Sequence, residues 1–158
     1  MLGLLHYVVA GLLPSIEPRY AVPVCIAAGY QPAACIAVGL VDVAVLALAL
    51  PRLISVVDRV LPRTRLAGLY ARYRARVERV ARRHEGLTLA GLIGFIAVPL
   101  PGTGMWTGAL LAYILGLGEK ASTLALLLGG LAGLAATLTP TLLVGGVLQR
   151  AGGLPPAS

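Results

Sequence analysis

The chain has 158 residues, of which 58% are hydrophobic and only 12% are charged, with a net charge of +7. Soluble domains usually carry about a quarter charged residues, so this composition excludes an ordinary soluble domain and predicts one integral membrane domain over residues 1–158. The sequence offers no Ser–His–Asp set, no catalytic carboxylate pair and no metal-ligand spacing. We therefore expect no enzymatic activity and no cofactor.

Residues 1–50 predict a broken helical hairpin followed by a membrane span. An apolar tract at 1–13 precedes the segment PSIEPRYAVP at 14–23, a short apolar piece follows, and a second apolar tract covers 33–50. Thirteen helical residues rise only about 20 Å, too little to cross a hydrocarbon core of about 30 Å. We expect the first tract to be retained and to form half of a re-entrant hairpin, and 33–50 to cross the membrane.

Ionisable residues in this first repeat are candidates for function. Glu17 and Arg19 lie between tracts that should be embedded in the membrane, and Asp42 lies inside the predicted span. Charges at such depth are costly, tend to pair and often mark a transport pathway. Asp42 needs a partner from the other half of the chain, a bound cation, water or a proton. Cys25 and Cys35, in apolar surroundings, are expected to be buried packing residues.

A basic linker at 52–85 predicts a cytoplasmic helix. Ten of the 13 basic residues lie between Arg52 and Arg83, and short loops rich in Lys and Arg stay in the cytoplasm. From residue 66 onward, Tyr70, Tyr73 and Val77 share one helical stripe and most arginines fall on the other side. This pattern indicates an amphipathic helix on the anionic inner leaflet. A topology signal explains the basic residues better than nucleic-acid binding does.

Residues 86–150 repeat the pattern of the first half. Apolar residues lead into PLPGTGMWTG at 99–108, a short apolar piece follows, and an apolar tract covers 121–148. Prolines stop a helix and glycines let a backbone approach a ligand closely. Pro101, Gly102, Thr103 and Gly104 therefore predict a turn, with Thr103 capping a helix that restarts near Met105. The free N–H groups of such a helix start could bind an anion.

Together these elements predict an all-α membrane protein built as an inverted repeat. Each repeat (1–50 and 86–150) would hold a re-entrant helical hairpin followed by one transmembrane helix, and the basic amphipathic helix at 52–85 would join them. This arrangement places the central loop in the cytoplasm and both termini outside the cell membrane. A chain this small has little surface to seal a pathway alone, so we expect a homodimer.

Two motifs resemble a known family. EPRYAVPVCIAAG, followed by GLIGFIAVPLPGTGMWTGALLAYILGL, is similar to the small multidrug export protein family, which pairs an E-x-R-x-A-x-P segment with a P-L-P-G-T-G-x-W-T-G segment. The chain departs from it at Tyr20, where members usually carry glycine, and at Asp42, where they often carry asparagine. By predicted architecture the family resembles the DedA superfamily, which implies transport of lipid-linked phosphates or lipid scrambling. By position, the resemblance implies roles for Glu17, Arg19, Thr103, Trp106 and Thr107.

Three functions follow as hypotheses. The first is a transporter, flippase or scramblase for an amphipathic anion such as a lipid-linked phosphate or phospholipid, coupled to protons or sodium. The second is an exporter of lipophilic cationic drugs, and the third is a membrane scaffold that transports nothing. We expect membrane lipids as partners and no nucleic acid. The candidate substrate-binding residues are Glu17, Arg19, Asp42, Gly102, Thr103, Gly104, Trp106 and Thr107.

Overall fold

The computed structural model describes residues 2–14, 16–60, 62, 67–83, 89–100 and 103–150. Within these ranges the regular structure is entirely α-helical, which confirms the expected all-α class. The helices are α1 (Leu2–Leu12), α2 (Glu17–Ala27), α3 (Pro32–Val60), α4 (Ala67–Arg83), α5 (Leu89–Ala97), α6 (Met105–Ile114) and α7 (Glu119–Arg150).

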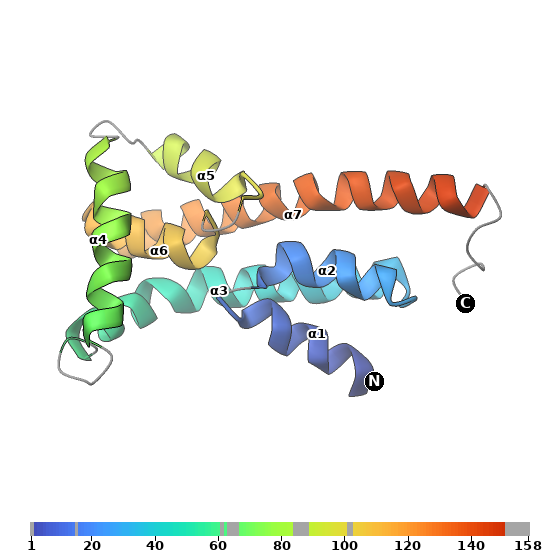
Figure 1. Cartoon of the computed structure of the whole chain (residues 1–158), viewed down its shortest axis with the longest axis horizontal. Coiled ribbons are helices and arrows are strands. Elements are labelled where there is room, and N and C mark those ends of the chain that lie inside the picture. The colour runs from blue at the N-terminus through green and yellow to red at the C-terminus, as the bar shows by residue number, and fades with distance from the viewer. Residues whose placement is uncertain are drawn as a thin grey trace.

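Two long helices form the axis of the molecule. α3 and α7 run side by side in opposite directions along its long axis (Figure 1). Glycines on both helices allow close packing: a Cβ on Gly39 would lie 2.4 Å from Val22 of α2, and a Cβ on Gly130 would lie 3.0 Å from Val43 of α3. In the described residues, α3 and α7 are the two helices that are long and apolar enough to cross a membrane.

The first long helix extends further than the sequence predicts. The expected span ended at residue 50 and the linker began at 52, but α3 continues through Pro51 to Val60. Pro51 removes one backbone donor from the helix. Leu50 and Ile54 on either side of it are nevertheless 0% and 5% exposed, so apolar packing holds both turns in the helix. Residues 52–60 therefore belong to α3 and not to the linker.

Two pairs of short helices flank this axis. α1 and α2 form a hairpin whose open side faces the end of the molecule where α7 finishes, and α5 and α6 form a second hairpin whose open side faces the end that α4 covers (Figure 1). α1 and α2 pack against α3, while α5 packs mainly against α7 and α6 packs against both long helices. The turns of the two hairpins meet partway along the axis, where Arg19 of α2 contacts carbonyl groups at the end of α5.

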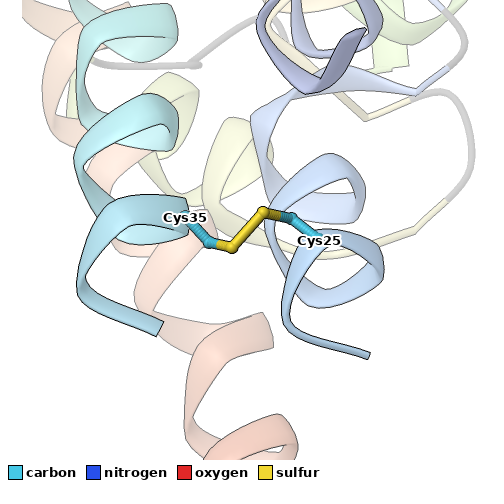
Figure 2. Close-up of a disulfide and its surroundings, with 2 residues drawn as sticks. All are labelled: Cys25 and Cys35. Atoms are coloured by element: carbon cyan, nitrogen blue, oxygen red, sulfur yellow. A yellow bond between two sulfur atoms is a disulfide. The ribbon is translucent and has the colours of Figure 1, made fainter. Parts of the chain in front are cut away.

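A disulfide joins α2 to α3. Cys25 and Cys35 lie 5.9 Å apart between their Cα atoms and are bonded to one another (Figure 2). Both residues are buried, as expected from the sequence. The expectation that they are simple packing residues is wrong, because the turn after α2 reverses the chain and brings the two thiols together. The bond closes a short loop and fixes the start of α3 against the second half of the first hairpin.

Contacts with α3 and α6 hold the basic helix α4 across one end of the axis (Figure 1). The Tyr70 hydroxyl donates a hydrogen bond of 2.8 Å to Asp58 of α3. Arg74 forms ion pairs with Asp58 and with Glu78. Burial and the hydrogen bond to Asp58 raise the pKa of Tyr70 to about 12. The opposite face of α4 exposes Arg72, Arg76 and Arg79, in agreement with the amphipathic pattern.

Candidate functional site

A buried ion pair at the start of α2 connects the two hairpins through hydrogen bonds to the backbone of the second one. Glu17 and Arg19 are 5% and 3% exposed, and the Arg19 Nη2 atom lies 3.3 Å from the Glu17 Oε2 atom. Both residues lie in the first turn of α2, which begins at Glu17 with Pro18 near its start, as the sequence predicts. We call Glu17, Arg19 and the backbone groups of Ile96, Val98 and Met105 that they bind the tip junction.

Arg19 binds the end of α5 in the other half of the chain. Its Nη1 atom donates to the Val98 carbonyl oxygen at 2.8 Å, and its Nη2 atom donates to the Ile96 carbonyl oxygen at 2.9 Å. The last carbonyls of a helix have no partner within the helix and carry a partial negative charge. Arg19 therefore supplies, from 77 and 79 residues away, the donors that α5 lacks at its C-terminus.

Glu17 binds the start of α6. The Met105 N–H donates a hydrogen bond of 3.1 Å to the Glu17 Oε2 atom. The helix has Gly104 as its N-terminal cap residue, and Gly104 has no side chain to accept this bond. A Cβ on Gly104 would lie 1.9 Å from the Glu17 Oε1 atom, so glycine makes room for the carboxylate. Glu17 itself has a φ of 54°, a left-handed conformation that costs a residue other than glycine about 1–3 kcal/mol.

Thr103 does not cap α6, contrary to the sequence-based expectation. Its Oγ1 atom donates instead to the carbonyl oxygens of Val98 and Leu100, at 2.6 and 2.9 Å, and so closes the turn after α5. The Glu17 carboxylate occupies the place at the helix start that the Thr103 hydroxyl was expected to fill. The helix does restart at Met105, as predicted.

Thr107 connects the first turn of α6 to the basic helix α4. Its hydroxyl shares a hydrogen bond of 2.8 Å with the Tyr73 hydroxyl. Desolvation raises the pKa of Tyr73, the hydrogen bond with Thr107 opposes this rise, and the negative charge of Glu17 adds to it. Tyr73 was expected only as part of an apolar stripe. A tyrosine in a stripe of this kind gives no signal of its hydrogen-bond partner.

The side chains of the remaining candidate residues, Asp42 and Trp106, make none of these contacts. Asp42 is 1% exposed in α3, and neither of its carboxyl oxygens has a hydrogen-bond partner in the described residues. Gly11 of α1 lies directly against it, since a Cβ there would fall 2.1 Å from the Asp42 Oδ2 atom. The indole nitrogen of Trp106 is also buried and without a partner in the described part of the chain. Gly102 lies outside the described residues.

The tip junction is electrically balanced within the chain. The negative carboxylate of Glu17 compensates the positive charge of Arg19 and of the N-terminus of α6. Arg19 also compensates the partial negative charge at the C-terminus of α5. An anion that bound at the start of α6 would have to displace the Glu17 carboxylate. Among the described residues, Asp42 is the buried charged side chain that lacks a partner.

This fold and this junction define a small, all-helical membrane protein with two long apolar helices. The family model described as "Putative small multi-drug export protein" matches residues 17–135, from the first residue of the tip junction to the middle of α7. The chain belongs to this family of small membrane export proteins. Searches of curated proteins and of solved structures find no significant match.

The buried ion pair of the tip junction should stabilise the fold far more than an exposed one. Replacing Arg19 with Met removes the cation from the buried Glu17 carboxylate and the side-chain donor from the Ile96 carbonyl, and should lower the free energy of unfolding by about 3–5 kcal/mol. The matched control is Arg52→Met, which removes an ion pair with Glu119 whose side chains are 73% and 53% exposed. It should cost about 0–1 kcal/mol. Denaturant unfolding in detergent measures both values, and equal losses would contradict the role given to Arg19.

Gly104 should be needed only because Glu17 lies against it. A methyl group at Gly104 would overlap the carboxylate, so Gly104→Ala should cost about 1–3 kcal/mol of stability. Gly118→Ala is the control, because no atom lies within 4 Å of a Cβ at that position. In a Glu17→Ala background the cost of Gly104→Ala should largely disappear. If the cost is the same in both backgrounds, the close approach to Glu17 does not explain the glycine.

Proposed function

We propose that the protein exports lipophilic cations across the cell membrane. The observation that carries the proposal is the charge balance of the tip junction. Arg19 and the N-terminus of α6, the two features expected to receive an anion, already have partners within the chain. Asp42, by contrast, is a buried acidic side chain without a hydrogen-bond partner in the described residues. Membership of a family described by multidrug export supports the same substrate class.

The lengths of the helices support a placement in the membrane. At 1.5 Å per residue, the 29 residues of α3 and the 32 residues of α7 extend about 43 and 48 Å, enough to cross a hydrocarbon core of about 30 Å. The 9–11 residues of α1, α2, α5 and α6 extend about 14–17 Å, or half of that thickness. We infer that the two hairpins are re-entrant, enter from opposite sides and meet in the interior of the membrane as an inverted repeat.

The disulfide and the basic helix support one orientation. Cys35 lies in the first turn of α3 and Arg59 lies in its last turn, so the disulfide and α4 are at opposite ends of one spanning helix. Disulfides persist in oxidising compartments outside the cytoplasm, whereas basic loops remain inside. We infer that the turn between α2 and α3 is outside and that α4 is cytoplasmic. Both termini would then be outside. The homodimer expected from the sequence remains a prediction.

The orientation predicts which introduced cysteines an impermeant reagent can reach. In intact cells, a membrane-impermeant maleimide should label Ala157→Cys and should not label Arg76→Cys on the exposed face of α4. After permeabilisation both variants should be labelled, which controls for reactivity. Mass spectrometry of the labelled chains measures the result. Labelling of Arg76→Cys in intact cells would overturn the orientation.

The substrate class predicts a difference between two transport assays on the same vesicles. Proteoliposomes containing the full chain should move radiolabelled tetraphenylphosphonium when a pH gradient is imposed, faster than protein-free vesicles. A fluorescent phospholipid or polyprenyl phosphate should flip at the rate of protein-free vesicles. The opposite result would replace cation export with anionic-lipid transport. If neither solute moves, the scaffold hypothesis becomes the better one.

A further inference from the structure

Asp42 is a buried carboxyl with no partner in the described part of the chain. It is the eleventh residue of α3, about 15 Å along the helix, so it lies at membrane depth if α3 spans the bilayer. It is 1% exposed, and both carboxyl oxygens lack a hydrogen bond. An ionised carboxylate in such surroundings is costly unless a cation accompanies it, and a protonated one avoids most of this cost.

The helices that surround Asp42 bring no cation to it. The helices packed against α3 are α1, α2, α4, α6 and α7. The ionisable groups that they carry within the described residues form no bond with Asp42. Arg19 binds Glu17 and α5, and Arg74 binds Asp58 and Glu78. The others that do not bond to Asp42 are His6 and Tyr7 of α1, Tyr20 of α2, Tyr113 of α6, and Glu119 and Lys120 of α7. No group within the described residues therefore neutralises this carboxylate, which leaves a proton or a bound cation for that role.

The backbone of α1 covers the carboxyl at Gly11. A Cβ at Gly11 would fall 2.1 Å from the Asp42 Oδ2 atom and 3.0 Å from its Cγ atom. A residue larger than glycine would therefore compete with the carboxyl for the same space. The close approach is a second observation, beside burial: the backbone of α1 lies directly on the carboxyl because residue 11 is glycine, so a cation that reaches Asp42 must come between α1 and α3.

We propose that Asp42 is the cation-binding group of this protein and holds either one proton or one monovalent lipophilic cation. The inference rests on the proposed export of cations and names its site. When the cation binds, the O–H bond of the Asp42 carboxyl breaks, the proton passes to water, and the carboxylate left behind pairs with the cation. One proton is released for each cation bound, and the net charge of the site does not change. Glu17 takes no part in this exchange, because its carboxylate belongs to the tip junction.

Carbodiimide labelling tests the site without relying on transport. Dicyclohexylcarbodiimide modifies protonated carboxyls in apolar surroundings, and mass spectrometry of the purified full chain in detergent locates the adduct. We expect an adduct on Asp42 that grows as the pH falls and declines when tetraphenylphosphonium is added at constant pH. Sodium chloride at the same ionic strength should give no protection. Protection by sodium alone, or no protection by either salt, would overturn the assignment of Asp42 to organic cations.

Two substitutions separate binding from folding. Asp42→Asn keeps the shape of the side chain and removes its charge, so tetraphenylphosphonium should bind roughly ten- to a hundredfold more weakly while the Tm does not fall. Gly11→Ala should also weaken binding, whereas Gly94→Ala should not, because a Cβ at Gly94 meets no atom within 4 Å. A fall in Tm with unchanged binding in Asp42→Asn would show that Asp42 is structural and would overturn the proposal.

The outcomes distinguish this inference from the proposed function. If the wild-type chain transports tetraphenylphosphonium and Asp42→Asn transports it equally well, export stands and the site is elsewhere. If tetraphenylphosphonium protects Asp42 from labelling but is not transported by the wild-type chain, the site stands and the export function fails.

Discussion

The fold depends on the need of interrupted helices for hydrogen-bond partners where water is scarce. α5 ends and α6 begins in the interior of the helical body, and each end leaves backbone groups without partners inside its own helix. The buried surroundings of Glu17 and Arg19 leave little room for water to supply the missing donors and acceptors, so the chain must supply them. It does so with one charged pair: Arg19 donates to the end of α5, and Glu17 accepts from the start of α6.

This requirement explains the other features of the junction. The carboxylate fits only because residue 104 is glycine, and the left-handed backbone at Glu17 is held by the contacts of its side chain. Thr103 is free to close the turn after α5 because the helix start is already occupied. The ion pair also distinguishes the two buried acidic residues, Glu17 and Asp42. Glu17 has a full set of partners, and Asp42 has none in the described residues, so only Asp42 is available for a cation from outside.

The sequence predicts the local interruptions well and the contacts between distant residues poorly. Pro101 and the nearby glycines mark the break before α6, which begins at Met105 as expected, and Pro18 lies in the first turn of α2. Motif reasoning also selected Glu17 and Arg19, because charges between apolar tracts are unusual. Their bonds to Ile96, Val98 and Met105 join residues 77–88 positions apart, and no local pattern encodes such a pairing.

The expectations that the structure corrects also depended on contacts between residues that local sequence patterns do not show. Thr103 was expected to cap α6 because a hydroxyl just before a helix often accepts a hydrogen bond from its first N–H groups. In the structure the Glu17 carboxylate of the other hairpin accepts that bond from Met105. Cys25 and Cys35 gave no signal of bonding, because their pairing depends on how the chain turns between α2 and α3. The first span was expected to end with the apolar tract at residue 50, yet buried side chains on both sides of Pro51 continue α3 to Val60.

The long separation within the tip junction has a consequence for biosynthesis. A ribosome adds about 5–20 residues per second, so Met105 follows Glu17 by on the order of ten seconds. During that interval the first hairpin exists without the helix ends that its charged pair serves. With the proposed re-entrant placement, Glu17 and Arg19 must stay near water or inside the insertion machinery until the second hairpin arrives. In that placement the first hairpin reaches its final depth late, and only together with the second half of the chain.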